Sequence, residues 1–411
     1  MKPMTDNRYG LDDMEYVDVL VKEASELIVE RGITEDKAAR DLIDDLVNEH
    51  QLLGNSLLHA DELGKISECV FGKIRGSLGA ITHLLADDSV NEIMINGPGR
   101  GFIEKDGKLV YIGRAFSSEK ELEQVIRRIA ASSRREINEL SPILDARLSD
   151  GSRVNAVLKN VALDGPILTI RKFKHKKITI DDMVLAGSIT QEAAESLETM
   201  VKGGMNIFVC GGTSSGKTTF LNAMADFIPR CERVITIEDS AELQLGDIDN
   251  LVRMECRNAN VTGKGNVDMA MLIKSSLRMR PDRIVVGEVR GEEVADMLQA
   301  LNTGHSGMST GHGNTVRGML RRLEAMYIMG SSMPIDAIRA QIVEGIDVMV
   351  HIARLSDGDR RVLEISEVTG YEDGNYSLNQ LYAMDKDMQL IKKSRNLKDD
   401  VKLRLKGLKY D

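Results

Sequence analysis

The spacing of hydrophobic residues first indicates helices. In residues 17–28, 42–47 and 66–74 the apolar positions recur every three or four residues, which predicts three amphipathic helices. Gly32 is placed to end the first, and Glu35 and Asp36 fall in the first turn of the second, where acids suit the helix dipole. Acidic side chains clearly outnumber basic ones here. We predict an acidic helical bundle over residues 1–77, which either docks a partner or is a solvated cap.

Beyond residue 78 the pattern changes to short alternating runs separated by turn signals. A helix is expected over residues 78–86, a strand over 92–96, and a hairpin around Asp106-Gly107. Residues 117–133 have helical spacing and begin with Ser118 three positions before Glu121, a capping pattern. A second Asp-Gly pair at 150–151 joins two further strands. Residues 78–172 are therefore predicted to form an α+β domain with an antiparallel sheet, followed by a linker over residues 173–190.

From residue 178 onward, buried-looking strands alternate with helices. Residues 206–210, 234–237 and 284–286 are short apolar runs rich in Val and Ile, and residues 191–202 and 219–225 have helical spacing. This alternation predicts an α/β core over residues 191–390 with a parallel sheet covered on both faces. In such sheets, ligands bind outside the carboxyl ends of the strands.

The last 21 residues, 391–411, form a basic tail. Leu397, Val401, Leu405 and Leu408 would form one apolar stripe on a short helix. Such a helix is either the last element of the fold or a surface for an acidic protein or a membrane.

A phosphate-binding loop follows the first strand of the α/β core. Residues 211–218 read GGTSSGKT and fit G-x-x-x-x-G-K-[ST] between a strand and a helix. Glycines let backbone N–H groups converge on an anion, and the following helix adds the positive end of its dipole. Lys217 can reach the β- and γ-phosphates, and the Thr218 hydroxyl can bind Mg²⁺. The residues expected to bind nucleotide here are Gly212, Thr213, Ser214, Ser215, Gly216, Lys217, Thr218 and Thr219.

Two acidic groups and a histidine-containing segment supply the remaining candidate chemistry. Glu288 ends a Val/Ile strand, as does the acid near Mg²⁺ in phosphate-loop enzymes. Glu238 ends another strand and is our choice to orient the attacking water, with Glu242 as its rival. Residues 303–315 are rich in Gly, Ser, Thr and His, and we expect them to form a polar loop in which His312 senses the γ-phosphate.

Composition limits the classes of function. The net charge is −10, aromatic residues make up 4% and Trp is absent, which disfavours nucleic-acid binding. No stretch approaches the roughly 18 consecutive apolar residues of a membrane span, and no apolar signal core follows the N-terminus. We expect a cytoplasmic protein. The four cysteines are widely separated, which favours neither a zinc site nor a disulfide framework.

Together these segments resemble the type II/IV secretion ATPases, and most closely the CpaF-type ATPases of Flp (tight-adherence) pili. The segments GGTSSGKTT (211–219), VITIEDSAELQL (234–245), LRMRPDRIVVGEVRG (277–291) and TGHSGMSTGHGNT (303–315) resemble that family's Walker A, Asp box, atypical Walker B and His box. Residues 145–173 resemble the domain that precedes its ATPase core. The likeness extends from about residue 78 to residue 370.

The resemblance implies a RecA-like core after a PAS-like α+β domain, a homohexamer, and ATP with Mg²⁺ as ligands. It assigns Lys217, Glu238, Glu288 and His312 to catalysis and Thr218 with Glu288 to the metal. Arg147, Arg153 and Arg171 are its candidate arginines for phosphate or subunit contacts. It further implies an inner-membrane platform protein as partner, so that the cytoplasmic ATPase associates peripherally with that membrane.

Three functional hypotheses therefore remain at this point. The first is an ATPase motor for pilus assembly or protein secretion. The second is a nucleic-acid-stimulated motor of helicase or recombinase type, which the charge balance disfavours and in which nucleic acid would stimulate turnover. The third is a nucleotide-gated scaffold that does not hydrolyse ATP.

Overall fold

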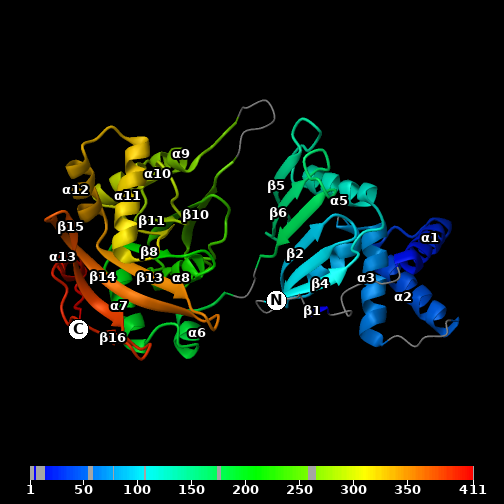
Figure 1. Cartoon of the computed structure of the whole chain (residues 1–411), viewed down its shortest axis with the longest axis horizontal. Coiled ribbons are helices and arrows are strands. Elements are labelled where there is room, and N and C mark those ends of the chain that lie inside the picture. Colours follow the sequence, from blue (N-terminus) through cyan, green and yellow to red (C-terminus); the bar gives the residue numbers. More distant parts are fainter. Residues whose placement is uncertain are drawn as a thin grey trace. The chain divides into compact units, whose positions relative to one another are not determined.

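The computed structural model describes residues 4–5, 14–53, 59–76, 78–105, 108–173, 177–257 and 265–410. It divides the chain into two compact units, Met1–His175 and Lys176–Asp411 (Figure 1). Among the helices that it describes, none combines the length and hydropathy needed to cross a membrane.

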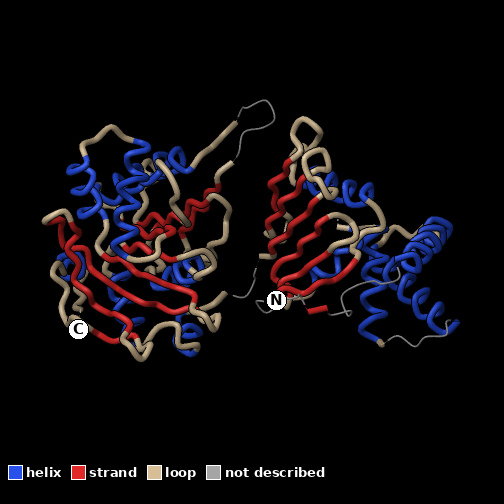
Figure 2. The backbone as a smooth tube through the Cα atoms, viewed as in Figure 1, coloured by secondary structure: helices blue, strands red, loops and turns tan. Residues whose placement is uncertain are grey.

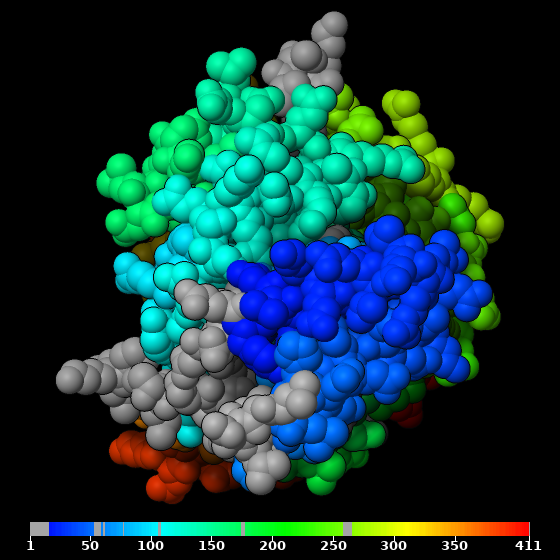
Figure 3. All heavy atoms as spheres, turned by 90° about the vertical axis from the view of Figure 1, so that its right-hand side faces the viewer, coloured from blue at the N-terminus to red at the C-terminus, as the bar shows by residue number. Residues whose placement is uncertain are grey.

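The first unit begins with the three predicted helices. They are α1 (Met14–Glu30), α2 (Asp36–Leu53) and α3 (Ala60–Ile74), and Gly32 adopts the left-handed conformation (φ +62°) just after α1. Their buried side chains belong to the same apolar cluster as those of the following sheet. The Lys73 ammonium lies 2.6 Å from Asp18 Oδ1 and 3.0 Å from Glu121 Oε1, which links α3 to α1 and to α5 (Glu119–Ser132). Figure 3 shows the helices, in blue, against the cyan segment of this unit.

The rest of the first unit is a seven-stranded sheet in the order β1-β4-β3-β2-β7-β6-β5, drawn in red in Figure 2. Every described pair is antiparallel except the short parallel pair β1–β4. Ser118 caps α5 by accepting from Glu121 N, as predicted. The Asp106-Gly107 turn lies outside the described residues. The strands are β1 (Met4–Thr5), β2 (Val90–Asn96), β3 (Gly101–Lys105), β4 (Lys108–Gly113), β5 (Ile143–Arg147), β6 (Arg153–Val157) and β7 (Ile167–Arg171); the short helices η1 (Gly79–Ile81) and α4 (Thr82–Ala86) precede β2.

The second unit is built on a nine-stranded mixed sheet in the order β10-β9-β11-β12-β8-β13-β14-β15-β16. The pairs from β10 to β13 are parallel, as predicted, and those from β13 to β16 are antiparallel. The strands are β8 (Ile207–Gly211), β9 (Arg233–Glu238), β10 (Asn250–Glu255), β11 (Arg283–Val286), β12 (Ser306–His312), β13 (Val348–Arg354), β14 (Arg360–Glu372), β15 (Asn375–Met384) and β16 (Leu390–Lys392).

Helices cover both faces of this sheet, which produces two apolar clusters. One cluster includes side chains from α6 (Ile180–Leu185), α7 (Gln191–Lys202), α8 (Lys217–Met224) and α13 (Val401–Leu405), with η2 (Ala225–Phe227) after α8. The other includes side chains from α9 (Met269–Ser276), α10 (Glu293–Asn302), α11 (Val316–Gly330) and α12 (Ile335–Gly345). Within the stretch 173–190 that we expected to be a linker, α6 buries Met183 in the first of these clusters.

The prediction of a polar loop over residues 303–315 is wrong in its centre, because residues 306–312 form the buried strand β12 between β11 and β8. Small residues are required there. A Cβ at Gly307 would lie 2.4 Å from Leu301 Cδ2 and 2.9 Å from the Ile284 carbonyl oxygen. The buried Thr310 hydroxyl donates to the Gly287 carbonyl at 2.8 Å, so its polarity is satisfied inside the sheet.

Asn206, immediately before β8, joins three segments of the core. Its buried side chain donates through Nδ2 to the Gly345 carbonyl at 2.9 Å and accepts at Oδ1 from Gly307 N at 2.9 Å. Its backbone N donates to Asp347 Oδ2 at 2.6 Å. These bonds fix the start of β8 relative to β12 and to the end of α12, and thereby position the phosphate loop at the other end of β8.

The basic tail is the last element of this unit, but the predicted apolar stripe is only half right. Leu397 and Leu408 pack against the cluster that contains α7. Val401 and Leu405 are exposed, whereas Leu403 is fully buried in the cluster that contains α7. Glu367, itself buried, accepts the backbone N–H groups of Lys398 and Asp399 at 2.8–2.9 Å. The tail is thus packed onto its own unit by Leu403, by the partly buried Leu397, Leu408 and Tyr410, and by the buried Glu367 carboxylate.

Candidate active site

The phosphate loop connects β8 to α8 in the second unit. A Cβ at Gly211 would lie 2.3 Å from the Ile352 carbonyl oxygen, so only glycine fits where the loop leaves the sheet. Gly216 precedes α8 with φ +91° and Ser214 has φ +58°. Among the described residues, no side chain caps the first turn of α8. Its N–H groups and the positive end of its dipole therefore remain available to an anion.

Lys217 is almost buried at the start of α8, with 6% of its surface exposed. Its Nζ donates to the Gly212 carbonyl at 3.0 Å and lies 3.3 Å from His312 Nδ1. Burial lowers the pKa of Lys217, and the Glu288 carboxylate opposes that shift. The ammonium thus lies between the loop backbone and the end of β12.

Glu288 and His312 follow or end neighbouring strands and lie next to each other. His312 Nε2 lies 2.8 Å from Glu288 Oε1, and the two atoms are not aligned for a hydrogen bond. Glu288 Oε2 accepts from Arg290 at 3.0 Å. Burial raises the pKa of Glu288, but the positive charges around it, first of all Arg290, outweigh burial, and the net shift is downward. Burial and then the Lys217 charge lower the pKa of His312.

The surroundings of His312 favour the neutral ring. A pKa below its ordinary value leaves the ring neutral at pH 7. Because an ammonium only donates, Nδ1 accepts from Lys217, and the ring proton is on Nε2, facing Glu288. Lys217, His312 and Glu288 therefore form one connected polar chain at the carboxyl ends of the central strands.

Glu238, at the end of β9, has a different environment. It is 3% exposed, and its Oε1 accepts from Glu242 N at 2.8 Å and from Leu243 N at 3.0 Å. Its Oε2 is buried without a hydrogen-bond partner in the described part of the chain. Burial raises the pKa of Glu238, and the two N–H groups oppose the shift. A Cβ at Gly287 would lie 3.0 Å from Glu238 Cγ, which places this carboxylate beside the residue before Glu288.

The residues present fit a polyphosphate with a divalent cation. Among the buried oxygens that the described residues leave without a hydrogen-bond partner are Ser215 Oγ, Glu238 Oε2 and Glu288 Oε1, and native proteins rarely leave such atoms unsatisfied. Ser215 lies in the phosphate loop, Glu288 faces the histidine that Lys217 contacts, and Glu238 lies beside Gly287. Thr218 and Thr219 are half-buried in the first turn of α8, whereas Thr213 is exposed in the loop. Hard oxygen donors such as Thr218 and Glu288 suit Mg²⁺.

The three arginines predicted to contact phosphate or a neighbouring subunit lie in the first unit and form one row. Arg147 pairs with Arg153 across β5 and β6, and Arg153 pairs with Arg171 across β6 and β7. Directly paired residues project from the same face of a sheet. That face is opposite the buried residues Leu144, Val154 and Ile170 of the same strands. The row concentrates positive charge at one end of three strands.

Sequence reasoning missed two arginines that contact the site. Arg290 bonds Glu288 and lies 3.9 Å from Asp239, and its place two residues after Glu288 was a usable signal. Arg360, the first residue of β14, donates through Nε to the Ser214 carbonyl at 3.0 Å. No local pattern connects Arg360 to the phosphate loop, because β13 and the hairpin that follows it bring the two together.

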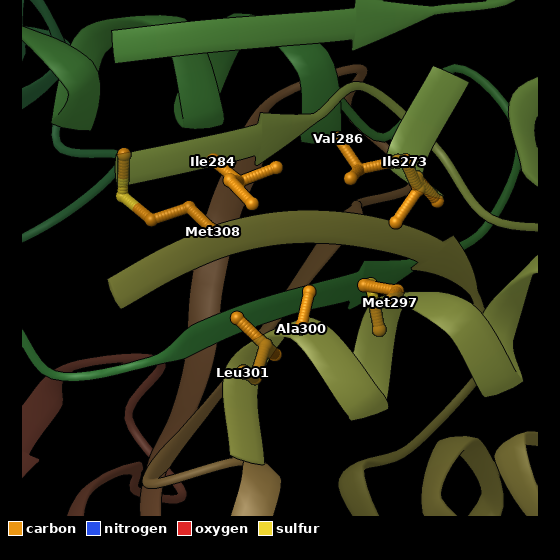
Figure 4. A pocket seen from close by; sticks show the side chains of 7 residues that line it. All are labelled: Ile273, Ile284, Val286, Met297, Ala300, Leu301 and Met308. Carbon is orange, nitrogen blue, oxygen red and sulfur yellow. The ribbon is translucent and has the colours of Figure 1, made fainter. Parts of the chain in front are cut away.

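An apolar cavity in the second unit is not part of this site. It lies between α9, α10, β11 and β12, and Figure 4 shows its lining of Ile273, Ile284, Val286, Met297, Ala300, Leu301 and Met308. Its volume of about 10 Å³ is at most that of one water molecule, and its lining offers almost no polar partner. It is a packing defect behind the strands and cannot hold a nucleotide.

Comparisons with known proteins show the family of this chain. The family model "Type II/IV secretion system protein" matches residues 75–388. A probable conjugal transfer protein of Sinorhizobium fredii, TrbB, is 37% identical over 312 residues, covering 74% of this chain and 92% of that protein. A putative conjugal transfer protein of Mycobacterium tuberculosis is 35% identical over 295 residues, covering 70% and 83%. The Legionella pneumophila ATPase DotB has a similar fold, with a TM-score of 0.52 and 21% identity over 72% of this chain and 81% of that one.

Proposed function

This chain belongs to the type II/IV secretion system protein family and is an ATPase of that family, and from this premise we propose that it is a motor whose ATP hydrolysis drives the transport of protein or pilin subunits across the cell envelope. The observation that carries the proposal is the chain from Lys217 through His312 to Glu288, beside an uncapped helix start. A scaffold that only binds nucleotide does not need a carboxylate held ionised next to the phosphate-binding lysine.

In the proposed mechanism, the phosphate loop binds and orients ATP. The backbone N–H groups of residues 212–219 and the Lys217 ammonium bind the β- and γ-phosphates. Thr218 and Glu288 would hold Mg²⁺, which would neutralise charge on the terminal phosphates. The low pKa of Glu288 keeps it ionised for this purpose. Arg290 fixes the orientation of that carboxylate through the hydrogen bond to Oε2.

Glu238 and His312 take the remaining roles. Glu238 offers a buried, unpaired oxygen next to Gly287, and we assign it to accept a hydrogen bond from the attacking water. Neutral His312 accepts from Lys217 at Nδ1, and its Nε2 faces the Glu288 carboxylate. When γ-phosphate is lost, Lys217 is released to bond His312 again, which would transmit hydrolysis to β12 and to α11 beyond it.

The finer architecture is also proposed. The second unit corresponds to a RecA-like core and the sheet of the first unit to a PAS-like domain. In a homohexamer, the row Arg147, Arg153 and Arg171 would supply charge to a nucleotide bound by the same or a neighbouring subunit. A row of three cations in register on adjacent strands, of which Arg171 is exposed and the other two are half-buried, supports that role.

Two transport machines compete for this motor. The four motif segments resemble the CpaF-type ATPases, which favours assembly of a Flp (tight-adherence) pilus through an inner-membrane platform protein, with the ATPase on the cytoplasmic side. The two relatives above carry names that refer to conjugal transfer, which favours a conjugation machine. Deleting the gene and scoring pilus formation and plasmid transfer separately would assign the machine, since each hypothesis predicts the loss of one process alone.

Substitution of Glu288 by Gln tests the enzymatic proposal. The amide preserves size but removes the negative charge, so we expect Glu288→Gln to bind nucleotide with nearly wild-type affinity and to hydrolyse ATP at least about a hundredfold more slowly. Binding by fluorescence titration and phosphate release should be measured on the same preparation. A wild-type rate would refute the assignment of Glu288, and the absence of nucleotide binding by the wild-type protein would refute the proposed function.

A further inference from the structure

We propose that Arg360 is a positioning residue that holds the phosphate loop in its anion-binding conformation, and that it does so by fixing the carbonyl of Ser214. This inference rests on the proposed function, because it concerns the loop that would bind the polyphosphate. Arg360 is far from the loop in sequence, and the guanidinium reaches the loop from the start of β14.

Arg360 contacts the phosphate loop at a residue whose backbone conformation is unfavourable. Ser214 has φ +58°, a conformation that a non-glycine residue adopts only at a cost in free energy. Its carbonyl oxygen accepts from Arg360 Nε at 3.0 Å. A charged donor makes a stronger hydrogen bond than a neutral one, so it can offset that cost. With its carbonyl turned to Arg360, Ser214 leaves the neighbouring N–H groups to face the anion.

A second contact brings the same side chain against the next left-handed residue. A Cβ at Gly216, where φ is +91°, would lie 3.0 Å from Arg360 Cδ. Arg360 therefore packs over the two loop residues whose backbone is inverted. Their conformation determines where the first N–H groups of α8 point. No other described side chain that hydrogen-bonds the loop comes from the hairpin between β13 and β14.

The backbone of Arg360 is held in place by the hairpin between β13 and β14. It pairs with Arg354 directly across the β13–β14 ladder, and the turn between them is closed by Leu355 N donating to the Asp359 carbonyl at 2.7 Å. β13 in turn pairs with β8, the strand that leads into the loop. The strand that leads into the phosphate loop and the hairpin that carries Arg360 therefore belong to the same sheet.

Arg354 provides a matched control. It has the same charge and the same hairpin position, and it is exposed like Arg360. No hydrogen bond or ion pair joins it to residues 211–218 in the described part of the chain. A general electrostatic effect would involve both arginines, whereas positioning of the loop would involve only Arg360.

The test uses the full chain and compares Arg360→Ala, Arg360→Lys and Arg354→Ala. Binding of fluorescent ADP and ATP analogues and steady-state hydrolysis are measured on each. We expect Arg360→Ala to weaken both nucleotides equally, by about tenfold, which is about 1.4 kcal/mol. KM should rise with kcat nearly unchanged, because the loop is held in the ground state and the transition state alike. Arg360→Lys, which keeps one donor, should recover part of the loss, and Arg354→Ala should bind as the wild type does.

A double-mutant cycle with Ser214→Gly isolates the mechanism. Glycine adopts positive φ without penalty, so Arg360→Ala should cost much less affinity in the Ser214→Gly background than in the wild type. Equal losses in both backgrounds, equal effects of the two arginine substitutions, or a loss confined to ATP would each overturn the proposal. Failure of the wild-type chain to bind nucleotide would refute the proposed function instead, so the two failures are distinguishable. Thermal unfolding of each variant checks that it is folded.

Discussion

Glu238 can be separated from its rival Glu242 by two substitutions of different kinds. The two carboxylate oxygens of Glu238 have different surroundings. Oε1 accepts two backbone N–H groups at 2.8 and 3.0 Å, and Oε2 is buried without a hydrogen-bond partner in the described part of the chain. Gln can still accept both N–H groups through its carbonyl oxygen but lacks the second carboxylate oxygen, whereas Ala lacks both oxygens.

The expected magnitudes follow from these contacts. A buried N–H left without a partner costs about 1–3 kcal/mol, so Glu238→Ala should lower the free energy of unfolding by about 2–4 kcal/mol. Glu238→Gln should change it by less than about 1 kcal/mol, since both N–H groups stay paired. Loss of the group that orients water should lower kcat by about a hundredfold or more in Glu238→Gln, with nucleotide affinity nearly unchanged. Glu242→Gln, the matched control, should keep kcat within about twofold.

The assay combines urea unfolding with single-turnover phosphate release from bound ATP, so that a change in the chemical step is not masked by product release. Wild-type turnover in Glu238→Gln together with a slow Glu242→Gln would transfer the role to Glu242. Wild-type turnover in both would refute the reasoning that a buried unpaired carboxylate marks the water site.

Three further predictions concern stability. Asn206→Ala removes two buried side-chain hydrogen bonds and should cost about 2–4 kcal/mol in urea unfolding, whereas an unchanged midpoint would contradict its bridging role. Leu403→Ala should cost about 2–5 kcal/mol and Leu405→Ala less than about 0.5, and equal effects would restore the predicted stripe. Burial lowers the pKa of His83 to about 4, below its ordinary 6.5. The neutral ring therefore contributes at most about 3 kcal/mol to the free energy of unfolding, and this contribution is complete above pH 6.5 and is lost as pH falls towards 4. His83→Gln should flatten that part of the curve of unfolding free energy against pH, and parallel curves for the variant and the wild type would refute the assignment.

The helices and most strands could be predicted because each carries its own local signal. The strand–loop–helix around Lys217, the capped helix α5 and the acid-ended strands β9 and β11 combine periodicity with end signals, and the structure confirms them. Parallel strands place their carboxyl ends together, so the approach of Glu288 to the phosphate loop was also predictable, whereas His312 was expected in a loop and lies at the end of β12.

The misses have a common cause, which is that packing between distant segments overrides local composition. β12 looks like a polar loop because its residues are small or carry hydroxyl groups. Leu301 of α10 lies so close to Gly307 that a larger side chain would clash there, and the Thr310 hydroxyl is satisfied inside the sheet by the Gly287 carbonyl, just after β11. In α13, a helix of five residues is too short for periodicity to decide between Leu403 and Leu405. Arg360 reaches the loop through sheet pairing that no window of sequence contains.

The measurement that tests the central claim most directly is Mg²⁺-dependent phosphate release from ATP by the wild-type chain and by Lys217→Ala, with thermal unfolding recorded on both. If one site at the carboxyl edge of the second unit's sheet performs hydrolysis, the wild type should release phosphate and Lys217→Ala should fall to background while its unfolding temperature stays within a few degrees. A folded Lys217→Ala protein that hydrolyses ATP at the wild-type rate would contradict the account.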